Sequence, residues 1–283
     1  MLYSDLFSPS KIKNMLNEHG ITLKKFLGQN FLIDKNSVER MIKAVDPKSD
    51  ETIIEIGAGL GTLTYALQSR VKKVIAYEID HRLIPFLQEV TRGLSYVTVH
   101  NDDVLHETYT RFGELQNFVV VGNVPYYATS RIIRHFLSAP YKPKRMVCMV
   151  QKEVAQRIMA RPPHMSLLSV SVQYYGAVIQ CFRVSKNCFF PKPKVDSAVI
   201  IMTLHGGVYE DEEHFFRVVR AGFKNKRKML VNTLCDGLNI PKEKILACMS
   251  TLSLSKTARA QELTLDQWKE LACKILVNLK IEN

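Results

Sequence analysis

The sequence of 283 residues lacks an apolar run long enough to span a membrane, and it lacks the apolar segment of a signal peptide near its N-terminus. We therefore expect a cytoplasmic protein without a membrane partner. It has one tryptophan, and none of its six cysteines forms a C-x-x-C pair, which indicates buried thiols in a reducing compartment. The eight histidines include no H-E-x-x-H motif, so we expect no metal site.

Acidic residues are also in short supply relative to basic ones. The formal net charge is +12, and most of the excess lies before residue 206. Clustered Lys and Arg gain affinity for a polyanion by displacing counterions from its phosphates, so the charge favours a nucleic-acid partner. The alternative is an ordinary solvated surface. The hydrophobic fraction of 46% is sufficient for a packed globular core.

A glycine-rich turn lies between two predicted strands. The β-branched run Thr52 to Ile56 predicts a strand, which is followed by glycines at alternate positions from Gly57 to Gly61 and by a predicted helix. The next strand, Val74 to Tyr77, ends at Glu78 and Asp80. Glycines allow a ligand to approach the backbone closely. A carboxylate at the second strand's tip can accept hydrogen bonds from both ribose hydroxyls. This order predicts a site for an adenosine-containing cofactor.

The spacing of the turn distinguishes two such cofactors. The dinucleotide pattern G-x-G-x-x-G would need a glycine where Thr62 stands. Glu55, two residues before the first glycine, would also repel a pyrophosphate, whereas a cationic amino group and a sulfonium tolerate it. S-adenosylmethionine is therefore favoured over NAD. Glu55 could instead be a strand end exposed to water.

Two further predicted strands end at the same edge. Tyr96 to Val99 precedes Asp102 and Asp103, either of which could accept a hydrogen bond from the adenine amine or could lie in a solvated turn. Phe118 to Val121 leads into Gly122-Asn123-Val124-Pro125-Tyr126-Tyr127. Amide and carbonyl acceptors beside a flat phenol ring suit a planar base with an exocyclic amine, although Gly, Asn and Pro also favour a simple turn. Convergence of four strand tips predicts one cleft.

Helical patterns surround this region. Ser8-Pro9 begins a short N-terminal helix that stops at Gly20, and Asp34 is placed to cap another helix. Gln29 and Asn30 come just before that second helix, where they could meet a ligand or belong to an ordered loop. After a linker near residues 205–213, helices are predicted at about 213–224, 226–237, 241–249 and 264–279.

Several motifs together resemble the ribosomal RNA adenine dimethyltransferase family, and within it the bacterial small-subunit enzymes. They occur in the family's order over roughly residues 24–235. The motifs are Leu27-Gly28-Gln29-Asn30-Phe31-Leu32, Glu55-Ile56-Gly57-Ala58-Gly59-Leu60-Gly61, Glu78, Asp103-Val104-Leu105, Asn123-Val124-Pro125-Tyr126, Gln151 to Arg157, Leu168-Ser169-Val170 with Gln173-Tyr174-Tyr175, and Phe190 to Val199.

The resemblance implies an α/β protein with a Rossmann-like class I methyltransferase domain and a small all-α C-terminal domain. The expected parts are a helical extension over 1–23, the S-adenosylmethionine-dependent domain over 24–205, and a helical RNA- or ribosome-contacting domain over 206–283. Cofactor-binding roles are implied for Asn30, Leu32, Gly57, Glu78, Asp103 and Asn123. Catalytic roles fall to Asn123 and Pro125 as acceptors for the target amine and to Tyr126 as its stacking face.

RNA contacts are expected at Phe190 and at the basic residues Lys224, Arg227 and Lys228. Further cations expected around the cleft are Arg131, Arg134, Lys142, Lys144, Arg145, Lys192 and Lys194. The sequence departs from the family pattern at Val124, at Asp102 and in the stretch Tyr127 to Ser130. The last of these is expected to alter how the target base enters.

The implied function is dimethylation of the N6 amines of two adjacent adenosines in small-subunit (16S) ribosomal RNA, with S-adenosylmethionine as the methyl donor. The expected partner is this RNA or the 30S precursor particle, bound by a monomer. Two alternatives share the cofactor motifs. One is a 23S ribosomal RNA adenine methyltransferase of the antibiotic-resistance type, and the other is a noncatalytic RNA-binding assembly factor.

Overall fold

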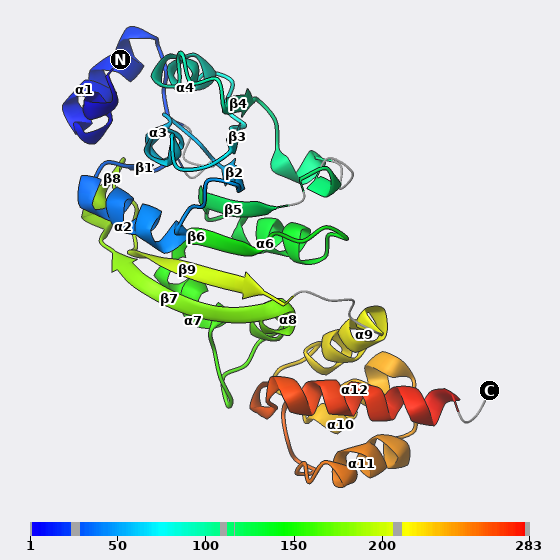
Figure 1. The fold of residues 1–283 in the computed structure, drawn as a ribbon. Helices are drawn as coiled ribbons and strands as arrows, with labels where there is room; N and C mark the ends of the chain where they lie inside the picture. The colour runs from blue at the N-terminus through cyan, green and yellow to red at the C-terminus, as the bar shows by residue number, and fades with distance from the viewer. Residues whose placement is uncertain (1, 24–28, 108–111, 116, 206–210, 281–283) are drawn as a thin grey trace. The chain divides into compact units, whose positions relative to one another are not determined.

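The computed structural model describes residues 2–23, 29–107, 112–115, 117–205 and 211–280 (Figure 1). The chain forms two compact units, Met1–Ala155 with Ala177–Leu204, and Gln156–Gly176 with His205–Asn283. The second unit thus includes a segment from the middle of the chain that the predicted domain boundaries assigned to the methyltransferase domain. Leu27 and Gly28 of the first motif lie outside the described residues. Within the described part of the chain, no helix has the length and apolar character needed to cross a membrane.

The first unit is built on a seven-stranded sheet with the order β4-β3-β2-β5-β6-β9-β7 (Figure 1). The strands are β2 (Thr52–Ile56), β3 (Lys73–Tyr77), β4 (Val97–His100), β5 (Phe118–Asn123), β6 (Arg145–Gln151), β7 (Gly176–Val184) and β9 (Ser197–Leu204). β4, β3, β2, β5 and β6 are parallel to one another, and β9 is antiparallel to β6. The four strands predicted from the sequence are confirmed.

The central strands are buried along their whole apolar runs. Every residue of β2 is buried, as is β5 from Phe118 to Gly122. Near-continuous Val and Ile runs of this kind are typical of parallel strands that are covered on both faces. One core cluster joins α2 residues such as Met41 to Ile53 of β2 and Val121 of β5. The helices of this unit are α1 (Pro9–Glu18), α2 (Lys35–Val45), α3 (Thr62–Leu67), α4 (Ile84–Val90) and α6 (Thr129–Leu137).

The N-terminal helical segment is part of the first unit's packing. Leu6 and Ile12 are fully or almost fully buried in a cluster that also contains Phe31 and Leu83. The predicted helix after Ser8-Pro9 and the cap at Asp34 are both confirmed, since Asp34 accepts a hydrogen bond from the Ser37 N–H at 2.7 Å. Burial of these apolar side chains explains why the segment is ordered on the unit.

The second unit is helical. It contains α8 (Leu167–Tyr175), α9 (Glu212–Gly222), α10 (Leu230–Leu238), α11 (Lys242–Thr251) and α12 (Leu265–Lys280), while α7 (Lys152–Ile158) spans the sequence position where the two units meet. Trp268 is completely buried, and Tyr174 stacks on Phe215 with 4.3 Å between ring centroids. The four predicted C-terminal helices are present, but the second begins at Leu230 and not at 226, because Met229 occupies its N-cap.

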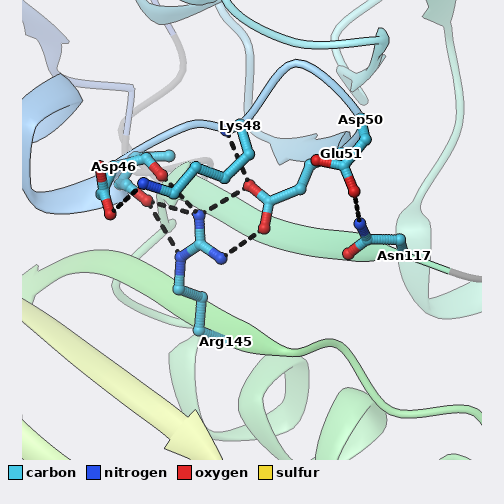
Figure 2. A network of polar contacts seen from close by, with 7 residues as sticks. Asp46, Lys48, Asp50, Glu51, Asn117 and Arg145 are labelled. Atoms are coloured by element: carbon cyan, nitrogen blue, oxygen red, sulfur yellow. Dashed lines mark hydrogen bonds and ion pairs between the residues drawn. The ribbon is translucent and has the colours of Figure 1, made fainter.

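The polar contacts of Arg145, at the start of β6, join this strand to Glu51, which directly precedes β2, and to the C-terminal end of α2 (Figure 2). The Arg145 guanidinium contacts both carboxylate oxygens of Glu51 at 2.7 and 2.8 Å, and it also donates to the carbonyls of Val45 and Asp46. Carbonyls at a helix C-terminus lack partners within the helix, and a cation there also complements the helix dipole. Arg145 therefore serves the fold, and its expected place on an RNA-binding rim is corrected.

The same contacts determine the titration of Glu51. Burial favours the neutral acid, but hydrogen bonds from Arg145 and from the Lys48 N–H outweigh it, so the pKa of Glu51 lies below its usual value. A carboxyl group with a depressed pKa contributes stability at neutral pH that is lost as the pH falls through the folded-state pKa.

Arg145→Ala is expected to lower the free energy of unfolding by about 3–5 kcal/mol, because it leaves the Glu51 charge buried without its partner. The matched control is Lys48→Ala, which removes an ion pair with Asp46 whose side chains are 56% and 71% exposed. That loss should stay below about 1 kcal/mol. Urea unfolding followed by circular dichroism measures both, and equal losses in the two variants would contradict the assignment.

Candidate functional site

The strand order reverses at β2, which has β3 on one side and β5 on the other. In open α/β sheets, ligands bind outside the carboxyl ends of the strands at such a switch point. The first unit has a cavity at this position, lined by the segments that follow β2, β3 and β5. Its lining includes all six residues predicted to bind a cofactor, together with Pro125, namely Asn30, Leu32, Gly57, Glu78, Asp103, Asn123 and Pro125.

The glycine turn and the tip of β5 approach each other through their backbones. Gly57 has φ +69°, and a Cβ at this position would lie 3.4 Å from the Asn123 carbonyl oxygen. A Cβ on Gly122 would come within 2.5 Å of the Ile56 carbonyl oxygen, closer than real Cβ contacts allow. The N–H groups of Gly57 and Ala58 both donate to the Tyr77 carbonyl, at 2.9 and 3.1 Å. The turn is thus held against the tips of both neighbouring strands.

Glu78 is held by two backbone N–H groups. Its oxygens accept from Gly59 at 2.8 Å and from Asp80 at 2.9 Å, and the residue is 6% exposed. Burial raises the pKa of Glu78, although these hydrogen bonds act in the opposite direction. Each carboxylate oxygen has a second lone pair, so the group can still accept two neighbouring hydroxyls. This geometry suits a ribose.

Glu55 is completely enclosed, at 1% exposure, so the alternative of a strand end exposed to water is wrong. The Thr64 hydroxyl donates to it at 2.6 Å. Burial raises the pKa of Glu55 from 4.5 to about 8, and the nearby Glu78 also raises it, while the Thr64 hydrogen bond lowers it. Glu55 lines the cavity as well, where a ligand cation would stabilise its ionised form.

Asp80 and Glu78 have different environments, although they are only two residues apart in the sequence. Arg82 binds Asp80 through two nitrogens, at 2.8 and 2.6 Å, and the Gln29 side chain donates to it at 2.7 Å. These contacts, that with Arg82 foremost, lower the pKa of Asp80 to about 2. Arg82 also donates to the Thr22 carbonyl, so the network ties the N-terminal segment to the tip of β3. This role of Arg82 could not be predicted from the sequence, because no spacing pattern marks it.

Asp103 and Asp102 differ in their burial and in their hydrogen bonds. Asp103 is partly buried, lines the cavity and caps a short 3₁₀ helix, Val104–His106, by accepting from the Leu105 N–H at 3.0 Å. Asp102 also lines the cavity but is exposed, and it accepts from the Asp103 N–H at 2.7 Å. The cap fixes one Asp103 oxygen and leaves the other as an acceptor toward the cavity.

The side chains of the stretch after β5 point in different directions. The Asn123 amide nitrogen donates to the Asn30 carbonyl at 2.8 Å, which orients the amide. Tyr127 lines the cavity and is 54% exposed. Tyr126 is half-buried and is not among the lining residues, and its hydroxyl shares a 2.8 Å hydrogen bond with Ser197. Burial raises the pKa of Tyr126.

Phe190, a predicted RNA-contacting residue of the first unit, is not among the residues that line the cavity. Phe190 belongs to β8 (Phe189–Phe190), which is antiparallel to β1 (Phe31–Leu32), and Phe31 pairs with Phe190. The pairing positions Leu32 in the cavity wall. Lys224, Arg227 and Lys228 are exposed on the turn between α9 and α10 of the second unit. Lys228 lies 3.6 Å from Asp236.

The Rossmann-like sheet, with a glycine turn after β2 and a buried acid at the tip of β3, is the fold of the class I methyltransferases. Solved structures agree with this class. The chain is 25% identical to a dimethyladenosine transferase from Plasmodium falciparum, with a TM-score of 0.75 over 86% of this chain and 96% of that one. It is 26% identical to the 23S rRNA methyltransferase ErmE, with a TM-score of 0.71 over 87% and 99% of the two chains.

Sequence comparison identifies the family. Residues 20–275 match the family model described as ribosomal RNA adenine dimethylase. Proteins named ribosomal RNA small subunit methyltransferase A are 37% identical in Dehalococcoides mccartyi, over 95% of this chain and 94% of that protein, and 38% identical in Bacillus mycoides, over 97% and 98%. The chain belongs to the ribosomal RNA adenine dimethylase family.

The unusual pKa of Glu55 gives a test of the site. With a folded-state pKa of about 8 against an ordinary value of 4.5, the native state binds this proton more tightly than the unfolded chain. The contribution of Glu55 to stability is therefore full below the lower pKa and falls between the two values, by about 1.4 kcal/mol per pH unit. Glu55→Gln removes the titrating group while keeping its shape.

Without cofactor, the Glu55→Gln variant should gain stability relative to the unsubstituted protein as the pH rises over this range. Urea unfolding of both proteins at several pH values measures the difference, in which titrating groups that do not interact with Glu55 cancel. A difference that does not change with pH would show that Glu55 is already ionised in the folded protein.

Proposed function

We propose that this protein uses S-adenosylmethionine to dimethylate the N6 amines of two adjacent adenosines in small-subunit (16S) ribosomal RNA. The observation that carries the proposal is the position of Asn123 and Pro125 in the wall of the cavity that also contains the glycine turn, Glu78 and Asp103. A methyl donor and an aminopurine would thereby share one site. The names of the curated relatives support the small subunit as the source of the RNA.

The cavity residues fit S-adenosylmethionine. The left-handed backbone of Gly57 and Gly59 leaves room for a ligand beside the main chain, and Glu78 is fixed for a ribose. Glu55 and Asp103 offer acceptors for an amino group and for the adenine amine, while Asn30 and Leu32 would line the methionine end. The cofactor supplies an electrophilic methyl group on a sulfonium. Glu55 accommodates this positive charge, whereas it would repel a pyrophosphate.

Asn123 and Pro125 would activate the target amine. The N6 lone pair of adenine is delocalised into the ring, so the nitrogen becomes nucleophilic only when acceptors hold its protons in a pyramidal geometry. Asn123 Oδ1 would accept a hydrogen bond from one N6–H group, because the Asn123 Nδ2 group already donates to Asn30. The Pro125 carbonyl would accept a hydrogen bond from the other N6–H group. Positioning and exclusion of water then supply most of the rate.

Tyr126 would stack on the extruded base. Its hydrogen bond to Ser197 fixes the ring, and base–aromatic stacking stabilises a nucleotide that has left its helix. Phe190 would provide a further base contact. Lys224, Arg227 and Lys228, with the net charge of +12, would bind RNA phosphates. In this scheme residues 24–205 perform the chemistry and residues 206–283 contact the RNA or the ribosomal particle.

Transfer of labelled methyl groups tests the proposal. Incubation with unmethylated small subunits and labelled S-adenosylmethionine should yield N6,N6-dimethyladenosine at two adjacent positions in the small-subunit RNA, located by primer extension. Free RNA, 30S precursor particles and large subunits are tested in parallel. Labelling of large-subunit RNA alone would indicate the resistance-type activity. Binding without any transfer would indicate a noncatalytic assembly factor.

Asn123→Ala should reduce methyl transfer by about a hundredfold or more, since it removes a fixed acceptor that acts on the reacting nitrogen. RNA affinity, measured by filter binding, should change by less than about threefold, because phosphate contacts dominate that affinity. Asn14→Ala is the matched control, as Asn14 is exposed on α1. Full transfer by Asn123→Ala would remove this residue from the mechanism.

A further inference from the structure

The Pro125 carbonyl already has two hydrogen-bond donors within the chain. The Ala128 N–H donates to it at 3.0 Å, and the Thr129 hydroxyl donates at 3.1 Å. Thr129 is the first residue of α6 and is 1% exposed. A carbonyl oxygen has two lone pairs, so both are occupied. If Pro125 accepts a proton of the target amine, one of these two donors has to leave.

The Thr129 hydroxyl is the donor that can move. The Ala128 N–H is part of the main chain where the helix begins, whereas a hydroxyl hydrogen turns about its C–O bond. A second acceptor is within reach, because the Thr129 Oγ1 lies 3.4 Å from the Tyr126 carbonyl oxygen. The Thr129 hydroxyl can therefore release the Pro125 carbonyl to an incoming N–H group and donate to the Tyr126 carbonyl instead.

The two methyl transfers make different demands on the acceptors. In each, the N6 lone pair forms the N–C bond as the S–C bond breaks, the bonding electrons remain on the thioether sulfur, and one N6 proton is released to solvent. The unmodified amine offers two protons to Asn123 and Pro125. The monomethylated amine has only one proton, so during the second transfer one of the two acceptors receives no hydrogen bond from the base.

A side chain of the protein can donate the missing hydrogen bond to the Pro125 carbonyl, but no described residue donates one to Asn123 Oδ1. Asn123 Oδ1 receives no hydrogen bond from the residues that the structure describes, so the single remaining N–H is best placed on Asn123. The first methyl group then faces Pro125, and the Thr129 hydroxyl again donates a hydrogen bond to the Pro125 carbonyl. We propose that Thr129 is a positioning residue that supports the second methyl transfer by donating to Pro125 whenever the base does not. This inference rests on the proposed function.

Thr129→Val tests it, because valine keeps the branched shape and removes the hydroxyl. Under single-turnover conditions with unmethylated small subunits, the first transfer should stay within about twofold of the unsubstituted enzyme. The second should slow roughly fivefold, as expected for the loss of one hydrogen bond. Nucleoside digestion and chromatography should then show accumulation of N6-methyladenosine. Thr129→Ser, which restores a hydroxyl, should restore the ratio of dimethylated to monomethylated product.

Thr91→Val is the matched control. The buried Thr91 hydroxyl also donates to the carbonyl four residues earlier, that of Leu87 at 2.8 Å, but Leu87 does not line the cavity, whereas Pro125 does. This variant should leave the product ratio unchanged. Thermal unfolding checks that each variant folds, and Thr129→Ala replaces Thr129→Val in the same assay if the valine variant does not.

The outcomes separate the two proposals. Equal slowing of both transfers by Thr129→Val, or an unchanged product ratio, would overturn the role of Thr129 while leaving the proposed function intact. No transfer by the unsubstituted protein would overturn the proposed function itself. Accumulation of monomethylated product by Thr129→Val but not by Thr129→Ser or Thr91→Val would support the role of Thr129.

Discussion

The close backbone contact between the ends of β2 and β5 is the constraint on which the rest of the site depends. Gly122 pairs with Ile56, and a Cβ on Gly122 would lie 2.5 Å from the Ile56 carbonyl oxygen. The absence of side chains at Gly57 and Gly122 thus brings the glycine turn beside Asn123 and Pro125. A side chain at Gly122 would force the ends of β2 and β5 apart, and one at Gly57 would strain a backbone whose φ is +69°. A transfer reaction depends strongly on such distances, because small displacements of the reacting groups slow it greatly.

The acids at this edge of the sheet have distinct electrostatic states, which local packing determines. Glu55 is enclosed with one hydroxyl partner, and burial raises its pKa to about 8. Asp80 is also buried, but Arg82 and Gln29 lower its pKa to about 2. Glu78 lies between them and is held by two backbone N–H groups. A cationic ligand in the cavity would stabilise the ionised form of Glu55, whereas Asp80 is outside the cavity lining and already has Arg82 as its cationic partner.

The residues around the proposed target amine are also fixed by hydrogen bonds within the protein. The amide of Asn123 is oriented by a main-chain carbonyl, Tyr126 is anchored through its hydroxyl, and Pro125 is saturated by donors from its own turn. The stretch is therefore organised before any ligand binds. Preorganised acceptors require little rearrangement during the reaction, which is the main way in which a protein without a covalent intermediate accelerates transfer.

The sequence by itself determined the sheet's central strands, the glycine turn and the family, because these depend on local patterns of apolar residues, glycines and short motifs. Predictions failed where a residue's role depends on partners distant in sequence. Arg145 resembles any other surface cation until Glu51 and the end of α2 lie beside it, and Glu55 could not be judged buried from its strand alone. The grouping of Gln156–Gly176 with the C-terminal helices is likewise invisible to periodicity.

The convergence of strand tips already predicted one cleft from the sequence, but only the tertiary structure left Phe190 and Tyr126 out of the cavity lining and revealed the Thr129 contact with Pro125. The physical reason is that a sequence pattern records which groups are present and how they repeat. Burial, pKa and hydrogen-bond occupancy depend instead on which segments fold against one another. In this protein such segments are a hundred or more residues apart in sequence, as for Arg145 and Val45 or Phe31 and Phe190.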